Sequence, residues 1–310
     1  MPCYHPIPVW QKRDQNGLPE FTKNGKKSLT FNNSNAILSS KFDIPCGQCI
    51  GCRQAKSLDW AIRCIHEAKF HEYNYFITLT YNDENLPENG SLCKRDLTLF
   101  FKRLRKRLGN GIRYYGVGEY GTNYLRPHYH ILLYMLENFQ DIVKAYSKDY
   151  KGRVGKVDFF QSDILDEIWS HGYCLITDIS FNTAAYVARY IHKRHYGTNA
   201  DAHYGDRIPE FAVMSRRPGI GRKFYDKYRS DLYNYDQCVV REGFILKPPK
   251  YYDRIYDIDN PEHLKKLKEA RKLKALSHTN DTTPERLSAR KECQREKFLR
   301  TKKRNFEKFG

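Results

Sequence analysis

The sequence predicts an α+β fold: a central antiparallel sheet with flanking helices, followed by a basic and largely helical C-terminal extension. Short segments rich in Val, Ile, Thr, Tyr and Phe indicate strands, and the segments between them carry apolar residues at helical spacing. The composition becomes strongly charged after Pro248-Pro249. We therefore expect an N-terminal region over 1–72, a core over 73–230 and the extension over 231–310.

Charge and cysteine content narrow the classes of function. The formal net charge is +18, and 24 tyrosines dominate an aromatic content of 14%, which suits a surface that meets phosphates and stacks on bases. A solvated basic surface without a nucleic-acid partner is the alternative. No run is as long as a transmembrane helix, and residues 1–5 lack the pattern of a signal peptide, so we expect a soluble, intracellular protein that uses no membrane. Nine cysteines in such a chain favour metal ligation or reduced thiols over disulfides.

After a loop-rich segment over 1–41, three cysteines follow one another at C-x-x-C-x-x-C spacing: Cys46, Cys49 and Cys52. They precede an amphipathic helix predicted over 58–68. Closely spaced thiolates on a Gly-containing turn can converge on one Zn²⁺. Cys3 is the expected fourth ligand, with His5 or Cys64 as alternatives. An iron–sulfur cluster or three reduced structural thiols would fit the same spacing.

The first strand of the core is predicted over 75–81, and its two faces differ. Thr78 and Thr80 lie on one side and the apolar residues on the other, which suits a sheet with a packed face and a working face. The next segment predicts a helix that Asp96 caps and Gly109 ends. Its many basic residues either follow a DNA backbone or form a solvated face.

A metal site is predicted at the end of the next strand and the beginning of the strand that follows it. A strand over 112–118 delivers Glu119 at its end, and a strand over 128–136 carries His128 and His130, which share a face because they lie two residues apart. Two imidazoles and one carboxylate leave positions open for water and a phosphate oxygen. A solvated Glu and a fortuitous H-x-H pair are the alternative reading of these residues.

The following elements lead to a second set of candidate residues. The segment 137–162 has no clear periodicity, so no element is predicted there. A helix over 163–169 stopped by Gly172 and a strand over 173–179 come next.

Two tyrosines and a lysine share one face of a helix predicted over 182–194. Tyr186 and Tyr190 are four residues apart, and Lys193 lies three beyond Tyr190. Spacing alone favours aromatic packing as their role. Beside a metal-bearing sheet in a basic protein, however, the tyrosines are candidate nucleophiles for covalent chemistry on a phosphodiester.

Several motifs stand in a fixed order along the chain: Phe76-Ile77-Thr78-Leu79-Thr80-Tyr81, Gly118-Glu119-Tyr120-Gly121, Arg126-Pro127-His128-Tyr129-His130, and Tyr186-Val187-Ala188-Arg189-Tyr190 with Lys193. Together with the segments 45–49 and 214–221, they resemble the HUH endonuclease superfamily. The resemblance is closer to the rolling-circle replication initiators of single-stranded DNA phages, the microviruses of gokushovirus type. It covers residues 42 to 225. Tyr129 stands where many relatives carry an apolar residue, on the side facing away from the metal.

The resemblance implies an HUH, Rep-like fold and a mechanism of DNA nicking and joining. Mg²⁺ or Mn²⁺ held by Glu119, His128 and His130 would polarise the scissile phosphate. Tyr186 or Tyr190 would attack it, leaving a 5′-phosphotyrosine link and a free 3′-OH, and the second tyrosine would later cut and rejoin the strand. Lys193 would neutralise charge on the phosphate or lower the pKa of the phenol.

The resemblance also implies partners and a setting. Single- and double-stranded phage DNA at the origin, with the replication helicase and polymerase of the host, are the expected partners, in the cytoplasm of a bacterial host. A relaxase or transposase with the same chemistry, or a non-enzymatic, zinc-dependent nucleic-acid-binding protein, are the alternatives.

Two basic segments close the chain. Residues 216–223 join basic side chains to a turn that either cradles DNA phosphates or is a surface loop. Residues 261–310 hold 16 Lys and Arg against 7 Asp and Glu, half of the net charge of +18. They predict one or two charged helices around Pro284 that either bind DNA without regard to sequence or stay solvated.

Overall fold

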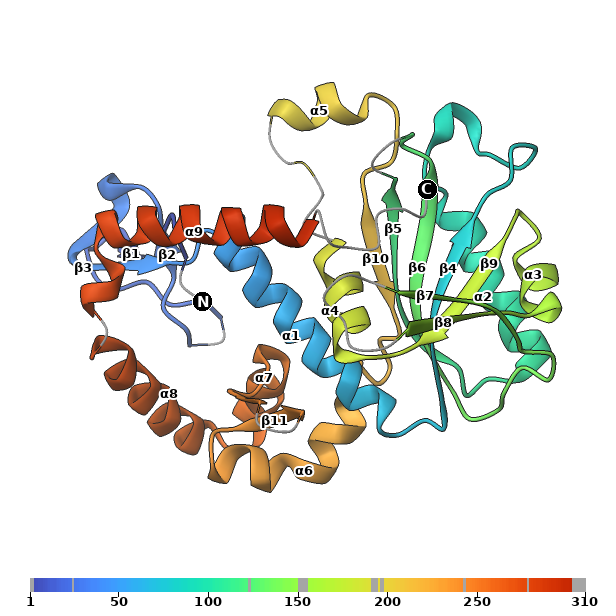
Figure 1. Ribbon diagram of the computed structural model, residues 1–310. Coiled ribbons are helices and arrows are strands. Elements are labelled where there is room, and N and C mark those ends of the chain that lie inside the picture. Colours follow the sequence, from blue (N-terminus) through green and yellow to red (C-terminus); the bar gives the residue numbers. More distant parts are fainter. Residues whose placement is uncertain are drawn as a thin grey trace. The chain divides into compact units, whose positions relative to one another are not determined.

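The computed structural model describes residues 3–23, 25–121, 124–149, 156–190, 195, 198–241, 244–277 and 279–302 (Figure 1). The chain divides into two compact units. One contains residues 1–55 and 275–299, and the other contains residues 56–274 and 300–310. The boundaries expected from composition stay a prediction.

A seven-stranded sheet forms the centre of the second unit. Its strands are β4 (Tyr73–Thr80), β5 (Arg113–Tyr120), β6 (Pro127–Met135), β7 (Val143–Asp149), β8 (Lys156–Gln161), β9 (Cys174–Asp178) and β10 (Phe211–Met214). They lie in the order β10-β5-β6-β4-β9-β8-β7, and every pair is antiparallel (Figure 1). The predicted α+β class with a central antiparallel sheet is therefore confirmed.

The sheet has more strands than the sequence predicted. The hairpin of β7 and β8 occupies the segment 137–162, where the absence of periodicity predicted no element. Nearly all side chains of β7 are exposed because it is the edge strand, so its sequence lacks the apolar alternation that marks a half-buried strand. Tyr146 stacks on Phe159 with ring centroids 4.7 Å apart. The short strand β10 was also not predicted.

Helices cover both faces of the sheet. On one face, α2 (Lys94–Leu108) and α3 (Asp163–Trp169) pack against Ile77, Tyr129 and Ile131. On the other face, α1 (Ile50–Ala68) and α4 (Phe181–Tyr190) pack against Leu132 and Tyr134. All nine residues of β6 are buried as a result. The face that carries Thr78 and the histidines is therefore covered by the helix that carries the tyrosines.

The prediction that Asp96 caps α2 is wrong. The helix begins at Lys94 after Cys93, and no side-chain hydrogen bond caps it. The Asp96 carboxylate instead accepts a hydrogen bond of 2.8 Å from the Tyr81 hydroxyl, and the Tyr81 and Tyr129 hydroxyls lie 2.9 Å apart. The Asp96 carboxylate therefore binds Tyr81, the residue that follows β4, and does not cap the helix. Gly109 ends α2 with a φ of 83°, as predicted.

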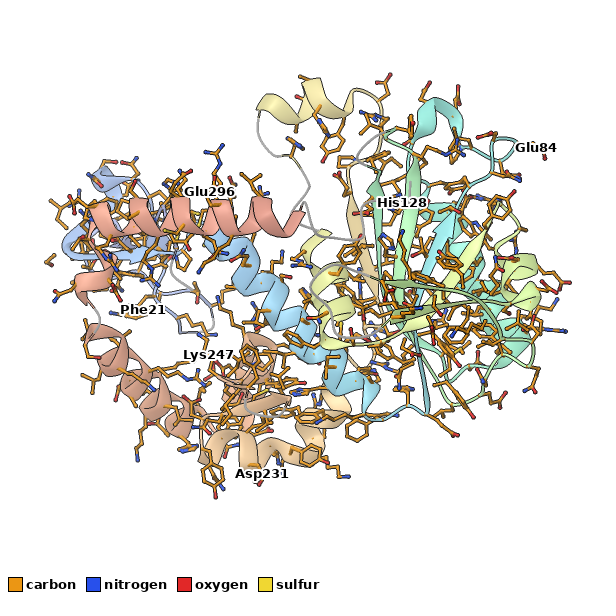
Figure 2. All side chains as sticks on the ribbon, viewed as in Figure 1. Phe21, Glu84, His128, Asp231, Lys247 and Glu296 are labelled. Atoms are coloured by element: carbon orange, nitrogen blue, oxygen red, sulfur yellow. The ribbon has the colours of Figure 1, made fainter. Side chains whose placement is uncertain are left out.

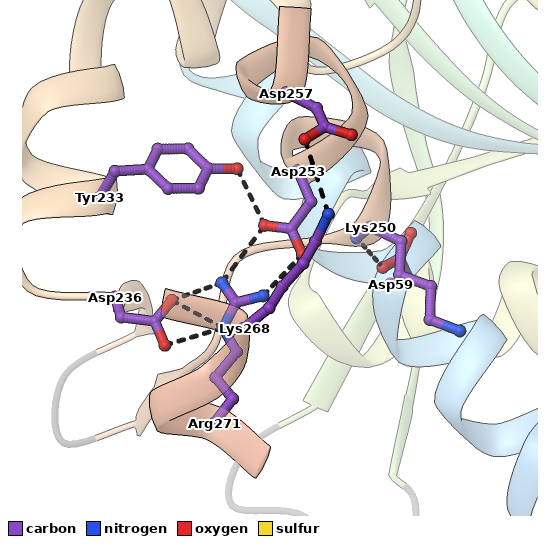
Figure 3. A network of polar contacts seen from close by, with 8 residues as sticks. All are labelled: Asp59, Tyr233, Asp236, Lys250, Asp253, Asp257, Lys268 and Arg271. Carbon is purple, nitrogen blue, oxygen red and sulfur yellow. Dashed lines mark hydrogen bonds and ion pairs between the residues drawn. The ribbon is translucent and has the colours of Figure 1, made fainter. Parts of the chain in front are cut away.

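The rest of the second unit is mainly helical. Its elements are α5 (Thr198–Tyr204), α6 (Arg222–Asn234), β11 (Cys238–Arg241), β12 (Phe244–Leu246), α7 (Lys250–Asp259) and α8 (Pro261–Leu276). Tyr204 of α5 is buried in the sheet core with Tyr120, whereas the elements from α6 to α8 pack on α1. Ile62 of α1 is buried with Phe224 and Tyr252. Figure 3 shows Arg271 of α8 between two carboxylates, 2.8 Å from Asp236 and 2.7 Å from Asp253. These bonds attach α8 to the segment after α6 and to α7.

The first unit contains a small antiparallel sheet in the order β2-β1-β3, with β1 (Ile7–Lys12), β2 (Leu29–Thr30) and β3 (Ala36–Ile44). The long helix α9 (Pro284–Lys302) begins at Pro284, so the prediction of charged helices around this proline is confirmed. Short 3₁₀ turns lie at Asn33–Asn35 and Thr279–Thr282 in this unit and at Glu88–Gly90 in the second unit. Among the residues that the structure describes, no helix is long and apolar enough to span a membrane.

Candidate metal centres and tyrosine helix

Strand register brings Glu119, His128 and His130 together. Glu119 of β5 lies directly opposite His128 of β6, and directly opposed side chains on one face of a sheet are close neighbours. His130 lies two residues further along the same face and opposite Thr78 of β4. His128 is labelled on the sheet in Figure 2. The geometry that the sequence predicted for these three side chains is therefore present.

The three side chains form a compact, buried group. Glu119 Oε1 lies 2.7 Å from His128 Nε2 and 3.2 Å from His130 Nε2. The exposed fraction is 2% for Glu119 and 7% for each histidine. One ligand atom from each residue lies within 4.8 Å of the other two. The group can thus offer two nitrogens and one oxygen to a single ion.

Hydrogen bonds on the far side of each imidazole orient the two rings. His128 Nδ1 lies 3.1 Å from the carbonyl oxygen of Arg126. Because a carbonyl can only accept, Nδ1 carries the proton and Nε2 is left on the side of Glu119. His130 Nδ1 lies 3.0 Å from Thr78 Oγ1. Metal-ligating histidines are usually held in this way by a partner of the other ring nitrogen.

The charge of the site also fits a cation. Burial by itself raises the pKa of Glu119, but His128 and His130 facing the carboxylate lower it to about 2. Glu119 is therefore ionised at neutral pH. A buried carboxylate beside two imidazoles with oriented Nε2 atoms is a donor set for a divalent ion.

The tyrosine helix α4 places one of the candidate nucleophiles beside this group. The helix begins after Ser180, whose hydroxyl accepts from the Thr183 N–H at 3.1 Å while the Thr183 hydroxyl accepts from the Ser180 N–H at 2.7 Å, a reciprocal cap. The half-buried Tyr186 then lies with its ring centroid 5.6 Å from that of His130 and 6.2 Å from that of Phe76. Tyr186 thus contacts a candidate metal ligand.

The other two predicted catalytic residues are described less fully. Tyr190 is the last residue of α4, one turn after Tyr186, and its side chain lies outside the described residues. Lys193 also lies outside them.

Two residues were not assigned a role from the sequence. Thr78 was placed on the working face, but only the strand register pairs it with His130. Arg189 lies three residues after Tyr186 and is half-buried. Burial lowers the pKa of Arg189, while the neighbouring Tyr186 acts in the opposite direction. The Y-x-x-R spacing on a predicted helix was the available signal for Arg189.

A second group consists of four cysteines in the first unit: Cys3, Cys46, Cys49 and Cys52. Their sulfur atoms all lie within 4.8 Å of one another, and those of Cys3 and Cys49 are 3.8 Å apart. Four sulfurs at about 2.3 Å from a central Zn²⁺ would be separated by about 3.8 Å in a tetrahedron. The spacing therefore fits a tetrahedral thiolate site with Cys3 as the fourth member.

Backbone N–H groups point at the sulfurs of this cluster. The N–H of Cys46 donates to Cys3 Sγ at 3.2 Å, that of Tyr4 to Cys49 Sγ at 3.3 Å, and that of Cys49 to Cys46 Sγ at 3.3 Å. Such bonds favour thiolates. Although burial raises the pKa of Cys49, hydrogen bonds from the backbone of Cys52 and Tyr4 lower it to about 6.

Once Cys49 is a thiolate, the neighbouring Cys52 thiol is harder to deprotonate. Burial, the neighbouring Cys3 and Cys49 side chains and the charge of Cys49 raise the pKa of Cys52 to about 12. A bound divalent cation would remove this repulsion. The alternative ligands do not belong to the cluster: His5 is exposed, and Cys64 is fully buried in the core with Tyr115 and Tyr134.

Known proteins resemble the chain over the residues that include Glu119, His128 and His130. The model of a family described as replication-associated protein ORF2/G2P matches residues 74–195. Replication-associated protein VP4 of Bdellovibrio phage phiMH2K is 32% identical over 235 residues, 72% of this chain and 70% of the relative. Replication-associated protein ORF2 of Spiroplasma virus 4 is 31% identical over 272 residues, 82% of this chain and 80% of the relative.

A further relative, replication-associated protein ORF4 of Chlamydia phage 1, is 29% identical over 217 residues, 68% of this chain and 53% of the relative. No solved structure matches the chain. The family match runs from β4 to just beyond α4, so it includes Glu119, both histidines and both tyrosines.

Proposed function

The chain belongs to the replication-associated protein ORF2/G2P family, and from this premise we propose that it starts rolling-circle replication of a single-stranded DNA phage by nicking DNA. The observation that carries the proposal is the contact between Tyr186 and His130, whose Nε2 faces the buried Glu119. It places a candidate nucleophile beside a candidate metal centre. Histidines on a central strand and tyrosines on a helix over the same face are also what the HUH fold would require.

Glu119, His128 and His130 would hold Mg²⁺ or Mn²⁺, which would polarise the scissile phosphate as a Lewis acid. The Tyr186 hydroxyl would attack the phosphorus and lose its proton to water. A phenolic O–P bond would form, and the bond from phosphorus to the 3′ oxygen would break. The 3′ oxygen would take up a proton, leaving a free 3′-OH and a 5′-phosphotyrosine. Arg189, one turn from Tyr186, would compensate charge on the phosphate.

Tyr190 would serve as the nucleophile of the second cleavage. After one round of synthesis, its attack on the regenerated junction would release a new 3′-OH. That hydroxyl would attack the first phosphotyrosine and close a unit-length circle, restoring the Tyr186 phenol. Lys193 would neutralise phosphate charge in one or both steps.

The products of nicking imply which other proteins would act with this one. A free 3′-OH needs a polymerase, and displacement of the nicked strand needs a helicase, so the replication machinery of a bacterial host would act with this protein in the host cytoplasm. Its own substrates would be single- and double-stranded phage DNA at the origin.

The test is to incubate the protein with Mn²⁺ and single-stranded oligonucleotides tiled across the phage origin, labelled at either end. We expect the 3′-labelled fragment to stay on the protein in a denaturing gel and the 5′-labelled fragment to be released with an extendable 3′ end. Tyr186→Phe should lower the rate of the first adduct at least 100-fold, since it removes the attacking oxygen. Tyr173→Phe, at an exposed tyrosine, is the matched control.

Two outcomes would overturn the proposal: no adduct with any oligonucleotide, or an adduct that survives replacement of both Tyr186 and Tyr190 by Phe. If the double variant kept every activity of the protein, a non-enzymatic nucleic-acid-binding role would replace nicking. A relaxase or transposase would give the adduct on a transfer-origin or transposon-end oligonucleotide rather than on phage origin DNA.

We also infer that the four-cysteine cluster holds a structural Zn²⁺. Its support is the sulfur spacing together with the backbone N–H groups aimed at three of the sulfurs. Elemental analysis of purified protein should find about one zinc per chain. Bound iron with visible absorption would favour an iron–sulfur cluster, and absence of both metals would leave four reduced thiols.

A further inference from the structure

The loop between β10 and α6, residues 215–221, is held by hydrogen bonds at Ser215, Pro218, Ile220 and Gly221. Ser215 exchanges two hydrogen bonds with the backbone of Tyr114, at 3.0 and 3.1 Å. The carbonyl of Pro218 accepts from Arg113 at 2.8 Å, and the carbonyl of Ile220 accepts from Arg63 at 3.1 Å. The loop is therefore attached to β5 on one side and to α1 on the other.

Two buried charged side chains, Glu67 and Arg63, bind the backbone of the loop. Glu67, whose side chain is 1% exposed, accepts from the Gly221 N–H at 2.6 Å and also binds Arg113. Arg63 is 7% exposed and lies between the rings of Trp60 and Tyr251, 3.9 Å from each ring centre. Burying charges is costly unless they are paired and hydrogen-bonded. An unpaired buried ion destabilises a fold by several kcal/mol, so the bonds of Glu67 and Arg63 to the loop backbone stabilise this loop conformation.

Close packing at Gly219 also restricts the conformation of the loop. A Cβ at Gly219 would overlap the hydroxyl of Tyr251, which also covers Arg63. Only glycine fits without displacing that ring. The loop is thus a fixed feature of the surface and differs from an ordinary solvated connection, which tolerates substitution.

This fixed loop presents two neighbouring arginines to solvent. Arg216 and Arg217 are both exposed, and no hydrogen bond or ion pair joins either side chain to another residue in the part of the chain that the structure describes. The nearby Arg113 and Arg222 are different, because Glu67 binds Arg113 and Asp226 binds Arg222 at 2.7 Å. The guanidinium groups of Arg216 and Arg217 are therefore available to an external anion.

The loop lies on the side of the sheet that carries the metal group. Ala212, Met214 and Ile220 belong to the same core as Phe76 and Tyr186. Met214 pairs with Tyr115, four residues before Glu119 on β5, which is about 13 Å along the strand. The loop and the metal group are therefore on the same side of the sheet.

We propose that Arg216 and Arg217 bind phosphates of the DNA strand that is nicked and hold it in register with the metal centre. The guanidinium fork matches phosphate oxygens two at a time, and a rigid loop loses little entropy when it binds. The inference rests on the proposed function for the identity of the strand. DNA binding by the two arginines can nevertheless be measured without nicking.

The experiment measures binding of a 5′-fluorescein-labelled oligo(dT) of about 20 nucleotides by fluorescence anisotropy, without added Mg²⁺ or Mn²⁺ and at about 50 to 200 mM KCl. The variants are Arg216→Gln with Arg217→Gln. Each phosphate contact to single-stranded DNA contributes about 0.7 to the slope of log K against log salt. We expect the double variant to lower that slope by about 1.4 and to bind about 10- to 30-fold more weakly at the lower salt concentrations.

Two control variants separate the proposal from a general effect of charge or folding. Lys106→Gln with Arg107→Gln removes the same charge from exposed positions on α2, which packs on the opposite face of the sheet, and should leave the slope unchanged. Arg216→Lys with Arg217→Lys keeps the charge and should restore most of the slope, which a merely structural role of the arginines would not predict.

An unchanged slope in the Gln variant, or an equal decrease in the α2 variant, would overturn the proposal. The adduct assay with Mn²⁺ distinguishes this failure from failure of the proposed function. If wild-type protein forms the adduct while the slope is unchanged, the loop inference alone is wrong. If no adduct forms but the slope falls as expected, the arginines bind DNA in a protein that does not nick it.

Discussion

At the scale of single residues, the hydroxyl of Thr78 is the contact that most directly controls the candidate metal centre. It lies 3.0 Å from His130 Nδ1 and so leaves Nε2 for Glu119 and an ion. His128 is oriented by a backbone carbonyl, which no substitution can remove. Thr78 is therefore the orienting partner that mutation can test.

Replacing Thr78 by Val should weaken Mn²⁺ binding by about 10- to 100-fold, the usual effect of losing a partner of a metal-ligating histidine. Val has the shape of Thr and suits a strand, so stability should change little. Isothermal titration with Mn²⁺ measures the effect. Thr80→Val is the matched control on the same face of β4, since the Thr80 hydroxyl bonds the carbonyl of Tyr173 at 3.1 Å. Equal affinities for wild type and Thr78→Val would show that Thr78 does not orient a ligand.

At the scale of elements, the turn from α3 into β9 determines how β4 ends. Tyr173 exchanges backbone hydrogen bonds with Thr80 at 2.9 and 3.1 Å, and Asn82 donates to the carbonyl of His171 at 2.9 Å. Gly172 lies between these bonds with a φ of +155°. A Cβ there would overlap the backbone of Thr80 and Asn82, so the strand end and the turn can approach only at a glycine.

Gly172→Ala should therefore lower the free energy of unfolding by about 2 kcal/mol or more, because strain and overlap both act at a backbone contact that cannot move aside. Urea denaturation followed by tryptophan fluorescence measures the loss. Trp169 is a suitable reporter, since its indole N–H donates to the carbonyl of Thr80 at 2.8 Å.

The matched control for this prediction is Gly111→Ala. Its Cβ would meet only the Leu136 side chain, at 3.6 Å, and its φ is not positive. We expect a change within about 0.5 kcal/mol. A similar small change for Gly172→Ala would contradict the proposed close packing of the turn.

At the scale of the whole molecule, the four-cysteine cluster joins the N-terminus to the start of α1. Cys46 and Cys3 are 43 residues apart in sequence, and the small sheet of β1, β2 and β3 lies between them. A metal that closes so long a loop removes many conformations from the unfolded chain, and structural zinc contributes about 10 to 16 kcal/mol of apparent binding free energy.

Cys3→Ser should therefore lower zinc content well below one atom per chain and expose residues 1–55 to protease while the second unit stays folded. Elemental analysis and limited proteolysis with mass spectrometry would measure both effects. Cys93→Ser is the control, because Cys93 is equally half-buried but lies outside the cluster. Full zinc content in Cys3→Ser would assign the fourth ligand to another residue.

Local patterns in the sequence determined the parts of the fold whose signal lies within one segment. Alternation in β4 separated Thr78 from Ile77, and the H-x-H spacing placed both histidines on one face, because side-chain direction in a strand depends only on the position along it. The spacing of three cysteines likewise identified a cluster, although Cys52 lies in the first turn of α1 and not before the helix. These features need no knowledge of what packs against them.

Only the tertiary structure decided which distant residues meet. The edge strand β7 carries exposed side chains and has no period to detect, Asp96 bonds Tyr81 instead of capping α2, and Arg63 and Glu67 hold a loop about 150 residues later in the chain. The physical reason is that periodicity reports burial of a face, whereas hydrogen bonds between elements depend on strand register and helix placement. Glu119 and His128 became a site because β5 and β6 pair in one register, and a shift of one residue would have turned them to opposite faces.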